Sequence, residues 1–168
     1  ARDRSAAAAR TGRIYPPGHY AVIREAGLEP AAERAAAALG LEEGAPAIRR
    51  RRTTYGPDSR PLSTSTSWFD GTLSAKAPAL LVAERIIEGT SAHAAARLGT
   101  KIVTTQERHA AGRASGEEAS ELGLPEGAPV LLGRSTFLAA DGTVVEYGES
   151  AALPDHWVFY EYTTEDGE

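Results

Sequence analysis

The sequence predicts an α+β fold, with a mostly antiparallel sheet of about six strands, helices packed on it and two pseudo-symmetric halves. One ten-residue stretch occurs twice, 83 residues apart, as 39–48 and 122–131, and seven of its positions are identical. Each copy reads as a helix end, a Glu-Gly-Ala-Pro turn, a strand, a turn and a second strand. Two copies are too few for a solenoid. Hairpins separated by helices are typical of antiparallel α+β sheets rather than doubly wound parallel ones.

The composition indicates a single globular domain and narrows its function. The chain has 168 residues, 42% hydrophobic and 24% charged, with a net charge of −5. An acidic balance argues against holding DNA as the main task of this stretch. No apolar run approaches membrane-spanning length, so we expect no membrane partner. Cysteine is absent, which excludes disulfides and thiolate chemistry and fits a cytoplasmic location.

Catalytic and metal-binding patterns are weak. The four histidines show no metal spacing, and no phosphate-loop, dinucleotide or nucleophile-elbow motif is present. We therefore expect no cofactor, no metal and no enzyme. Methionine is absent even at position 1, so we expect a piece of a longer protein. Residues 1–13 are expected to form a linker from a missing N-terminal part, and residues 14–164 the domain itself.

Turn and capping signals divide the chain into elements. Gly27, Gly40 and Gly99 each predict the end of a helix. Thr90 or Ser91 is expected to cap a helix running to Leu98. Ser115 and Glu118 form a predicted capping box. The expected helices are 19–26, 31–39, 91–98 and the one after Ser115, with a helical turn after Pro78 in an otherwise irregular 73–81. The expected strands are 47–55, 62–68, 101–111, 130–138, 144–151 and 156–162.

Four consecutive arginines, Arg49 to Arg52, lie on the first long predicted strand. Side chains alternate along a strand, so Arg50 and Arg52 share a face with Ile48, and Arg49 and Arg51 share the other. If Ile48 faces the core, Arg50 and Arg52 point inward and could clamp a phosphate or carboxylate. The alternative is a solvated strand face with glutamate partners across the sheet.

Other polar side chains are candidates for the same kind of site. The hydroxyls of Thr90 and Ser91 stand at a predicted helix start, where free amides and the helix dipole favour an anion. Ser65 lies in a serine- and threonine-rich strand, and Glu107 and Glu146 lie on later strands. Simple capping and cross-strand hydrogen bonding are the alternative roles for the hydroxyls.

Several stretches together resemble the UTRA effector-binding domain of GntR-type transcription regulators, in the HutC subgroup. The resemblance runs from about Gly18 to Tyr162. It is carried by 45–52, Ser65-Thr66-Ser67-Trp68, Gly89-Thr90-Ser91 with Arg97-Leu98-Gly99, Glu107 with Ala110-Ala111 and Arg113, 122–131 with Arg134-Ser135-Thr136, Val145-Glu146, and Leu153-Pro154 with Trp157.

The resemblance implies a chorismate-lyase-like fold, a small and often anionic effector, and a homodimer. It also implies a winged helix-turn-helix ahead of this stretch, through which alone the protein would bind DNA. The ligand residues would be Arg50, Arg52, Ser65, Thr90, Ser91, Glu107 and Glu146, with Arg49 and Arg51 the alternative register. Ser65 and Ala152 replace an acid and a tyrosine of sugar-binding members. A chorismate-lyase-like enzyme is the alternative function.

Overall fold

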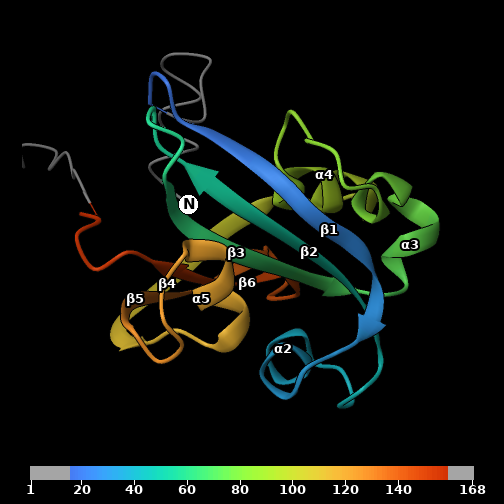
Figure 1. Ribbon diagram of the computed structural model, residues 1–168. Helices are drawn as coiled ribbons and strands as arrows, with labels where there is room; N and C mark the ends of the chain where they lie inside the picture. Colours follow the sequence, from blue (N-terminus) through green and yellow to red (C-terminus); the bar gives the residue numbers. More distant parts are fainter. Residues whose placement is uncertain (1–15, 159–168) are drawn as a thin grey trace, which may run out of the picture.

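The computed structural model describes residues 16–158 and places six strands in one antiparallel sheet (Figure 1). The strands are β1 (Tyr20–Pro30), β2 (Pro46–Tyr55), β3 (Pro61–Asp70), β4 (Ile102–Arg113), β5 (Pro129–Ala139) and β6 (Val144–Ala152). The helices are α2 (Glu33–Leu39), α3 (Leu73–Lys76), the 3-10 helix η1 (Pro78–Leu81), α4 (Thr90–Arg97) and α5 (Gly116–Leu122). The spatial order β1-β2-β3-β6-β5-β4 puts β3 and β6 at the centre. The predicted fold class is confirmed.

The sequence repeat corresponds to two structural halves, β1-α2-β2-β3 and β4-α5-β5-β6. Adding 83 to the bounds of α2 gives the bounds of α5. The turns match as well, because Gly44 N donates to Ala31 O at 3.0 Å and Gly127 N donates to Ala114 O at 3.0 Å. Both helices end at a glycine with positive φ, a conformation that favours glycine. The repeat therefore spans each whole half.

Helices cover both faces of the sheet. On one face, which we call the α2/α5 face, α2 packs against Ala47 and Trp68, and α5 packs against their counterparts Val130 and Ala151. On the other, the α4 face, a larger cluster forms around Phe69 under α3, η1 and α4. That cluster contains Ile48, Phe69, Leu73, Ala77, Leu80, Ala94, Ala95, Ala139 and Val145. The alternation of Ala47 and Ile48 on β2 sends one side chain to each face.

The helix predicted over 19–26 is wrong, because this segment belongs to strand β1. It pairs antiparallel with β2 from Tyr20 opposite Tyr55 to Pro30 opposite Pro46. The ladder with β2 supplies backbone hydrogen bonds and buried contacts that override the weak helical pattern. The repeat contained the missing signal, since the correctly predicted strand 101–111 lies 83 residues after 18–28.

The remaining predicted elements agree in outline, with two differences at the loops and the end. The segment 73–81 contains α3 in addition to η1, which begins at Pro78 as predicted. The predicted strand 156–162 is not seen in its described part, because 156–158 lie in no helix or strand. Residues 159–162 and the predicted linker 1–13 lie outside the described range. None of the helices in residues 16–158 is long and apolar enough to cross a membrane.

Candidate functional site

A cavity of about 550 Å³ lies on the α4 face, between the sheet and the segment that leads into α4. Strands β2, β3 and β6 supply most of its floor, β1 and β5 contribute at its sides, and residues 85–92 supply its opposite wall. Six of the seven predicted site residues line it, namely Arg50, Arg52, Ser65, Thr90, Ser91 and Glu146. Arg50 and Glu146, 96 positions apart in sequence, thus line the same cavity because β3 lies between β2 and β6 in the sheet.

Small side chains keep the floor of the cavity open. Arg52 stands opposite Ser65, and Ser65 stands opposite Ser150 on β6. In the next row on the same face, Arg50 stands opposite Ser67, and Ser67 stands opposite Gly148. Directly opposed residues share a face of the sheet. The alternating serines therefore place hydroxyls beside both arginines without filling the space above them.

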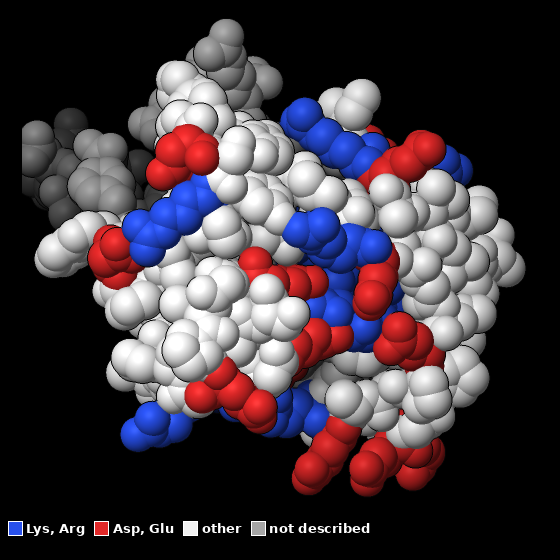
Figure 2. Space-filling view, viewed as in Figure 1, with Lys and Arg blue, Asp and Glu red and all other residues white. Residues whose placement is uncertain are grey.

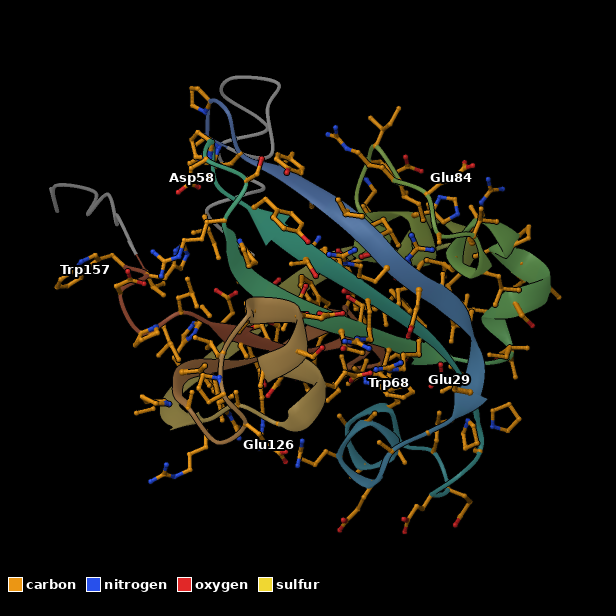
Figure 3. The ribbon with its side chains drawn as sticks, viewed as in Figure 1. Glu29, Asp58, Trp68, Glu84, Glu126 and Trp157 are labelled. Carbon is orange, nitrogen blue, oxygen red and sulfur yellow. The ribbon has the colours of Figure 1, made fainter. Side chains whose placement is uncertain are left out.

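Arg50 holds the cavity's outer segment to the sheet. Its guanidinium donates to the carbonyl oxygens of Ala79 (3.2 Å), Leu80 (2.6 Å), Val82 (2.7 Å) and Glu84 (2.8 Å). Glu84, labelled in Figure 3, lies on the segment ahead of α4. The side chain is only 4% exposed, and burial lowers the pKa of Arg50. These contacts make Arg50 an anchor for residues 79–84.

Glu146 joins the start of α4 to the centre of the sheet. Its Oε1 accepts from Ser67 Oγ at 2.6 Å, and its Oε2 accepts from Thr90 Oγ1 at 2.8 Å. The carboxylate is buried, at 4% exposure. A buried carboxylate needs hydrogen-bond donors, and two hydroxyls from β3 and α4 provide them.

The predicted capping of α4 by Thr90 or Ser91 is wrong. Gly89 occupies the N-cap position with φ of 89°, and no side chain caps the helix. Thr90 is already the first helical residue, and its hydroxyl is engaged by Glu146. Amides in the first helical turn have no partner within the helix. Because Gly89, Ser91 and Ala92 line the cavity, the uncapped end of α4 borders it.

Arg52 differs from its neighbour Arg50 in its partners. Its Nε donates to Ser65 Oγ at 2.9 Å. None of the salt bridges within residues 16–158 involves Arg52, although the carboxylate of Glu146 lines the same cavity. The cavity therefore contains a half-buried cation on its floor, facing a wall that holds a helix N-terminus.

Arg49 and Arg51 point to the opposite face, where glutamates surround them. Arg49 Nη2 lies 2.8 Å from Glu117 Oε2, and Arg51 Nη2 lies 2.5 Å from Glu121 Oε1. Figure 2 shows blue and red side chains interleaved near the middle of the molecule. Burial acts to lower the pKa of Arg49, but ion pairs led by Glu117 outweigh it and raise that pKa. The structure thus puts Arg50 and Arg52, not Arg49 and Arg51, at the cavity.

Glu107 is the predicted site residue that does not line the cavity. It lies on β4, opposite Ser135 of β5, and Ser135 does line the cavity. The sequence also missed part of the outer wall, including Arg85 and Glu88. Glu88 Oε1 lies 2.7 Å from Nδ1 of buried His93 on α4. The pKa of Glu88 is lowered mainly by a hydrogen bond from its own backbone N–H, and next by the hydrogen bond with His93. No periodicity in 82–89 could have predicted these positions.

The comparisons with known proteins agree with this architecture. The model of the UTRA domain family matches residues 73–157. The effector domain of PhnF from Mycobacterium smegmatis superposes with a TM-score of 0.72 at 19% identity, covering 97% of this chain and 94% of that one. A GntR-family transcriptional regulator from Bacillus cereus gives 0.70 at 20% identity, covering 88% and 99%. No curated protein matches the sequence.

The fold and the cavity together define a chorismate-lyase-like α+β domain with a partly open cavity on one face of its sheet, lined by both polar and apolar side chains. More particularly, the chain belongs to the UTRA domain family. The family match extends through α3, α4 and the whole second half, so it includes Thr90, Ser91 and Glu146 but not the β2 arginines.

Proposed function

We propose that this domain is the effector-binding and dimerisation domain of a bacterial, cytoplasmic GntR-type transcription regulator of the HutC subgroup. A winged helix-turn-helix domain ahead of it would bind DNA, and the effector would modulate that binding. The UTRA family match and the likeness to the PhnF effector domain support this proposal. So does the likeness to the longer PhnF chain from Mycobacterium smegmatis, of which this chain covers 68% at 19% identity and a TM-score of 0.70.

The effector is a small molecule with an anionic group. One observation carries this, namely that Arg52 and the uncapped start of α4 border the same cavity. A guanidinium can bind a carboxylate or phosphate with two parallel hydrogen bonds. Free amides and the dipole at a helix N-terminus favour the same charge. An anion between them would be held from the floor and the wall at once.

The predicted ligand residues divide into two groups with different tasks. Arg52, Ser65 and Ser91 border the cavity and are assigned to effector contacts. Arg50 and Glu146 hold residues 79–90 in place and so shape the cavity. An effector that bridges Arg52 and α4 would favour one arrangement of α4 relative to the sheet. Its regulatory effect is limited to its difference in affinity between the two arrangements.

Titration with inorganic phosphate and then a panel of anionic metabolites tests the proposed site, with the melting temperature as readout. The key variant is Arg52→Ser, which installs the counterpart residue Ser135 of the second half. The matched control is Arg49→Ser, which removes an arginine from the opposite face of the same strand. We expect Arg52→Ser to weaken anion binding about tenfold or more, and Arg49→Ser to leave it unchanged. Equal binding by wild type and Arg52→Ser would contradict the assignment.

A chorismate-lyase-like enzyme on the same fold is the alternative. The similar structures described above are named as transcriptional regulators. Incubating the domain with chorismate and measuring product by chromatography separates the two proposals. Turnover that depends on Arg52 would replace the sensor proposal with the enzyme.

A further inference from the structure

The two outermost strands of the sheet, β1 and β4, present very different edges. A bulge between Ile23 and Glu25 interrupts β1 in its middle, and the strand ends at Pro30. The bulge of β4 lies at its start, between Ile102 and Thr104. Residues 104–113 then pair with β5 without interruption. Among the described residues, β4 has a ladder partner on one side only, so its outer backbone groups form a long and regular edge.

Natural proteins usually protect such an edge with proline, lysine or a bulge, because another strand can pair with it. The stretch 104–113 contains no proline and no lysine. Towards its end it carries Ala110, Ala111 and Gly112, whose small side chains allow a second strand to approach closely. Ala110 and Ala111 are exposed. This edge therefore has the features of a pairing surface rather than of a protected one.

The charges on β4 favour one particular self-pairing. A two-fold axis between antiparallel strands runs perpendicular to the sheet, so opposed residues must come from the same face and differ by an even number. Within 104–113, centring the axis on Glu107 or on Arg108 sets like charges against each other. Centring the axis on Ala110 sets Glu107 of each copy opposite Arg113 of the other copy, so the interface contains two pairs of opposite charge. Arg113 Nη1 already donates to Gly127 O at 3.0 Å, and a guanidinium has further donors for a carboxylate.

We propose that two copies of this domain associate through β4, antiparallel about an axis at Ala110, and join their sheets into one continuous sheet. This rests on the dimerisation in the proposed function and names the surface that carries it. Because the axis is perpendicular to the sheet, the α4 faces of both copies lie on the same side. Both effector cavities then open on one side of the joined sheet.

A charge exchange tests this pairing on the full 168-residue chain, with the dissociation constant of the dimer measured by sedimentation equilibrium. Glu107→Lys and Arg113→Glu each place two like-charged pairs in the interface. Each is expected to weaken the dimer about tenfold or more. The double variant restores both pairs in reversed order and should return to within about threefold of wild type. Arg108→Glu on the same strand, opposite Gly112 in this register, is the control and should change little.

The outcomes separate the interface from the proposed function. A dimer unchanged by either single substitution, or not recovered by the double one, overturns the β4 pairing while dimerisation stands. A dimer lost only when residues 159–168 are deleted also overturns it. A wild-type chain that stays monomeric overturns both the interface and the proposed dimerisation. Circular dichroism and the melting temperature of each variant show whether a weaker dimer reflects unfolding, and the double variant keeps the test valid if one single variant does not fold.

Discussion

The two halves of the domain share their backbone but differ in chemistry. Both have the same helix ends, the same glycine turns and the same ladders. Yet β2 carries Arg49, Arg50 and Arg52 where β5 carries Leu132, Gly133 and Ser135. Glu146 on β6 takes the place that Ser63 holds on β3. The positions that agree build the scaffold, and the positions that differ build the cavity and its anchors.

The helices show the same contrast in their ion pairs. Helix α2 contacts β6 and helix α5 contacts β3, so each of the two helices also touches the other half of the domain. A charged residue of each helix forms an ion pair with that other half. On α5, Glu117 pairs with Arg49 and Arg51 of β2. Its counterpart on α2, Arg34, pairs with Glu149 of β6 at 2.7 Å. Because the charges are reversed, pairing either half with a second copy of itself would set like charges together. The halves are therefore complementary rather than interchangeable.

The largest effect is expected from truncating Phe69, a large core side chain that only the first half of the domain has at this position. Phe69 is fully buried under α3, η1 and α4, whereas its counterpart in the second half is Ala152. Phe69→Ala should lower the free energy of unfolding by about 3–5 kcal/mol, because it leaves a cavity in the core. Urea denaturation measures it, with Leu28→Ala on exposed β1 as control. A loss under about 1.5 kcal/mol would show that the core collapses around the gap.

The second effect concerns the anchor on β2. Arg50→Ala leaves the carbonyl oxygens of 79–84 without their donor and should cost about 3 kcal/mol. Amide hydrogen exchange should quicken in 79–90 before it does in β3, because this segment loses its attachment. Arg60→Ala, an exposed arginine in the turn before β3, is the control. Unchanged exchange in 79–90 would contradict the anchoring role.

A smaller effect on stability is expected from exchanging the residues at the N-terminal ends of α5 and α2. Ser115 caps α5, with Ser115 Oγ accepting from Glu118 N and Glu118 Oε2 accepting from Ser115 N. The equivalent residue of α2 is Ala32, and α2 has no side-chain cap. Ser115→Ala should cost about 1 kcal/mol, and Ala32→Ser should gain up to about 1 kcal/mol. Thermal unfolding of both variants checks the pair; a loss at both positions would mean that Ala32 cannot act as a cap.

The smallest effect is expected from reversing the charge of Arg34, which forms an ion pair between the two halves of the domain. Arg34→Glu sets a carboxylate beside Glu149 and installs the residue that α5 carries at this position. Because Arg34 is largely exposed, the loss should be only about 0.5 kcal/mol and should vanish at high salt. Chemical denaturation at two salt concentrations measures it, with Arg34→Gln separating repulsion from the lost pair. A salt-independent loss would point to packing instead.

The sequence alone determined the fold class, the twofold repeat, five of the six strands and which β2 arginines share a face, but left open which pair borders the cavity. These follow from local rules, since turn glycines and strand alternation are written in neighbouring residues. It also identified Thr90, Ser91 and Glu146 as polar positions of interest. The sequence predicts a helix in place of β1 because Gly27 looks like a helix end. The ladder that makes this segment a strand is formed with β2, which lies farther along the chain.

Only the tertiary structure decided what each polar residue does. Arg50 and Arg52 look equivalent in the sequence, but one meets four backbone carbonyls and the other meets a serine. Thr90 looks like a cap, but Glu146 reaches it from β6. Glu107 looks like a cavity residue, but the sheet order puts it on the outermost strand. These partners lie tens of residues away, and hydrogen-bond acceptors such as backbone carbonyls leave no mark in the sequence.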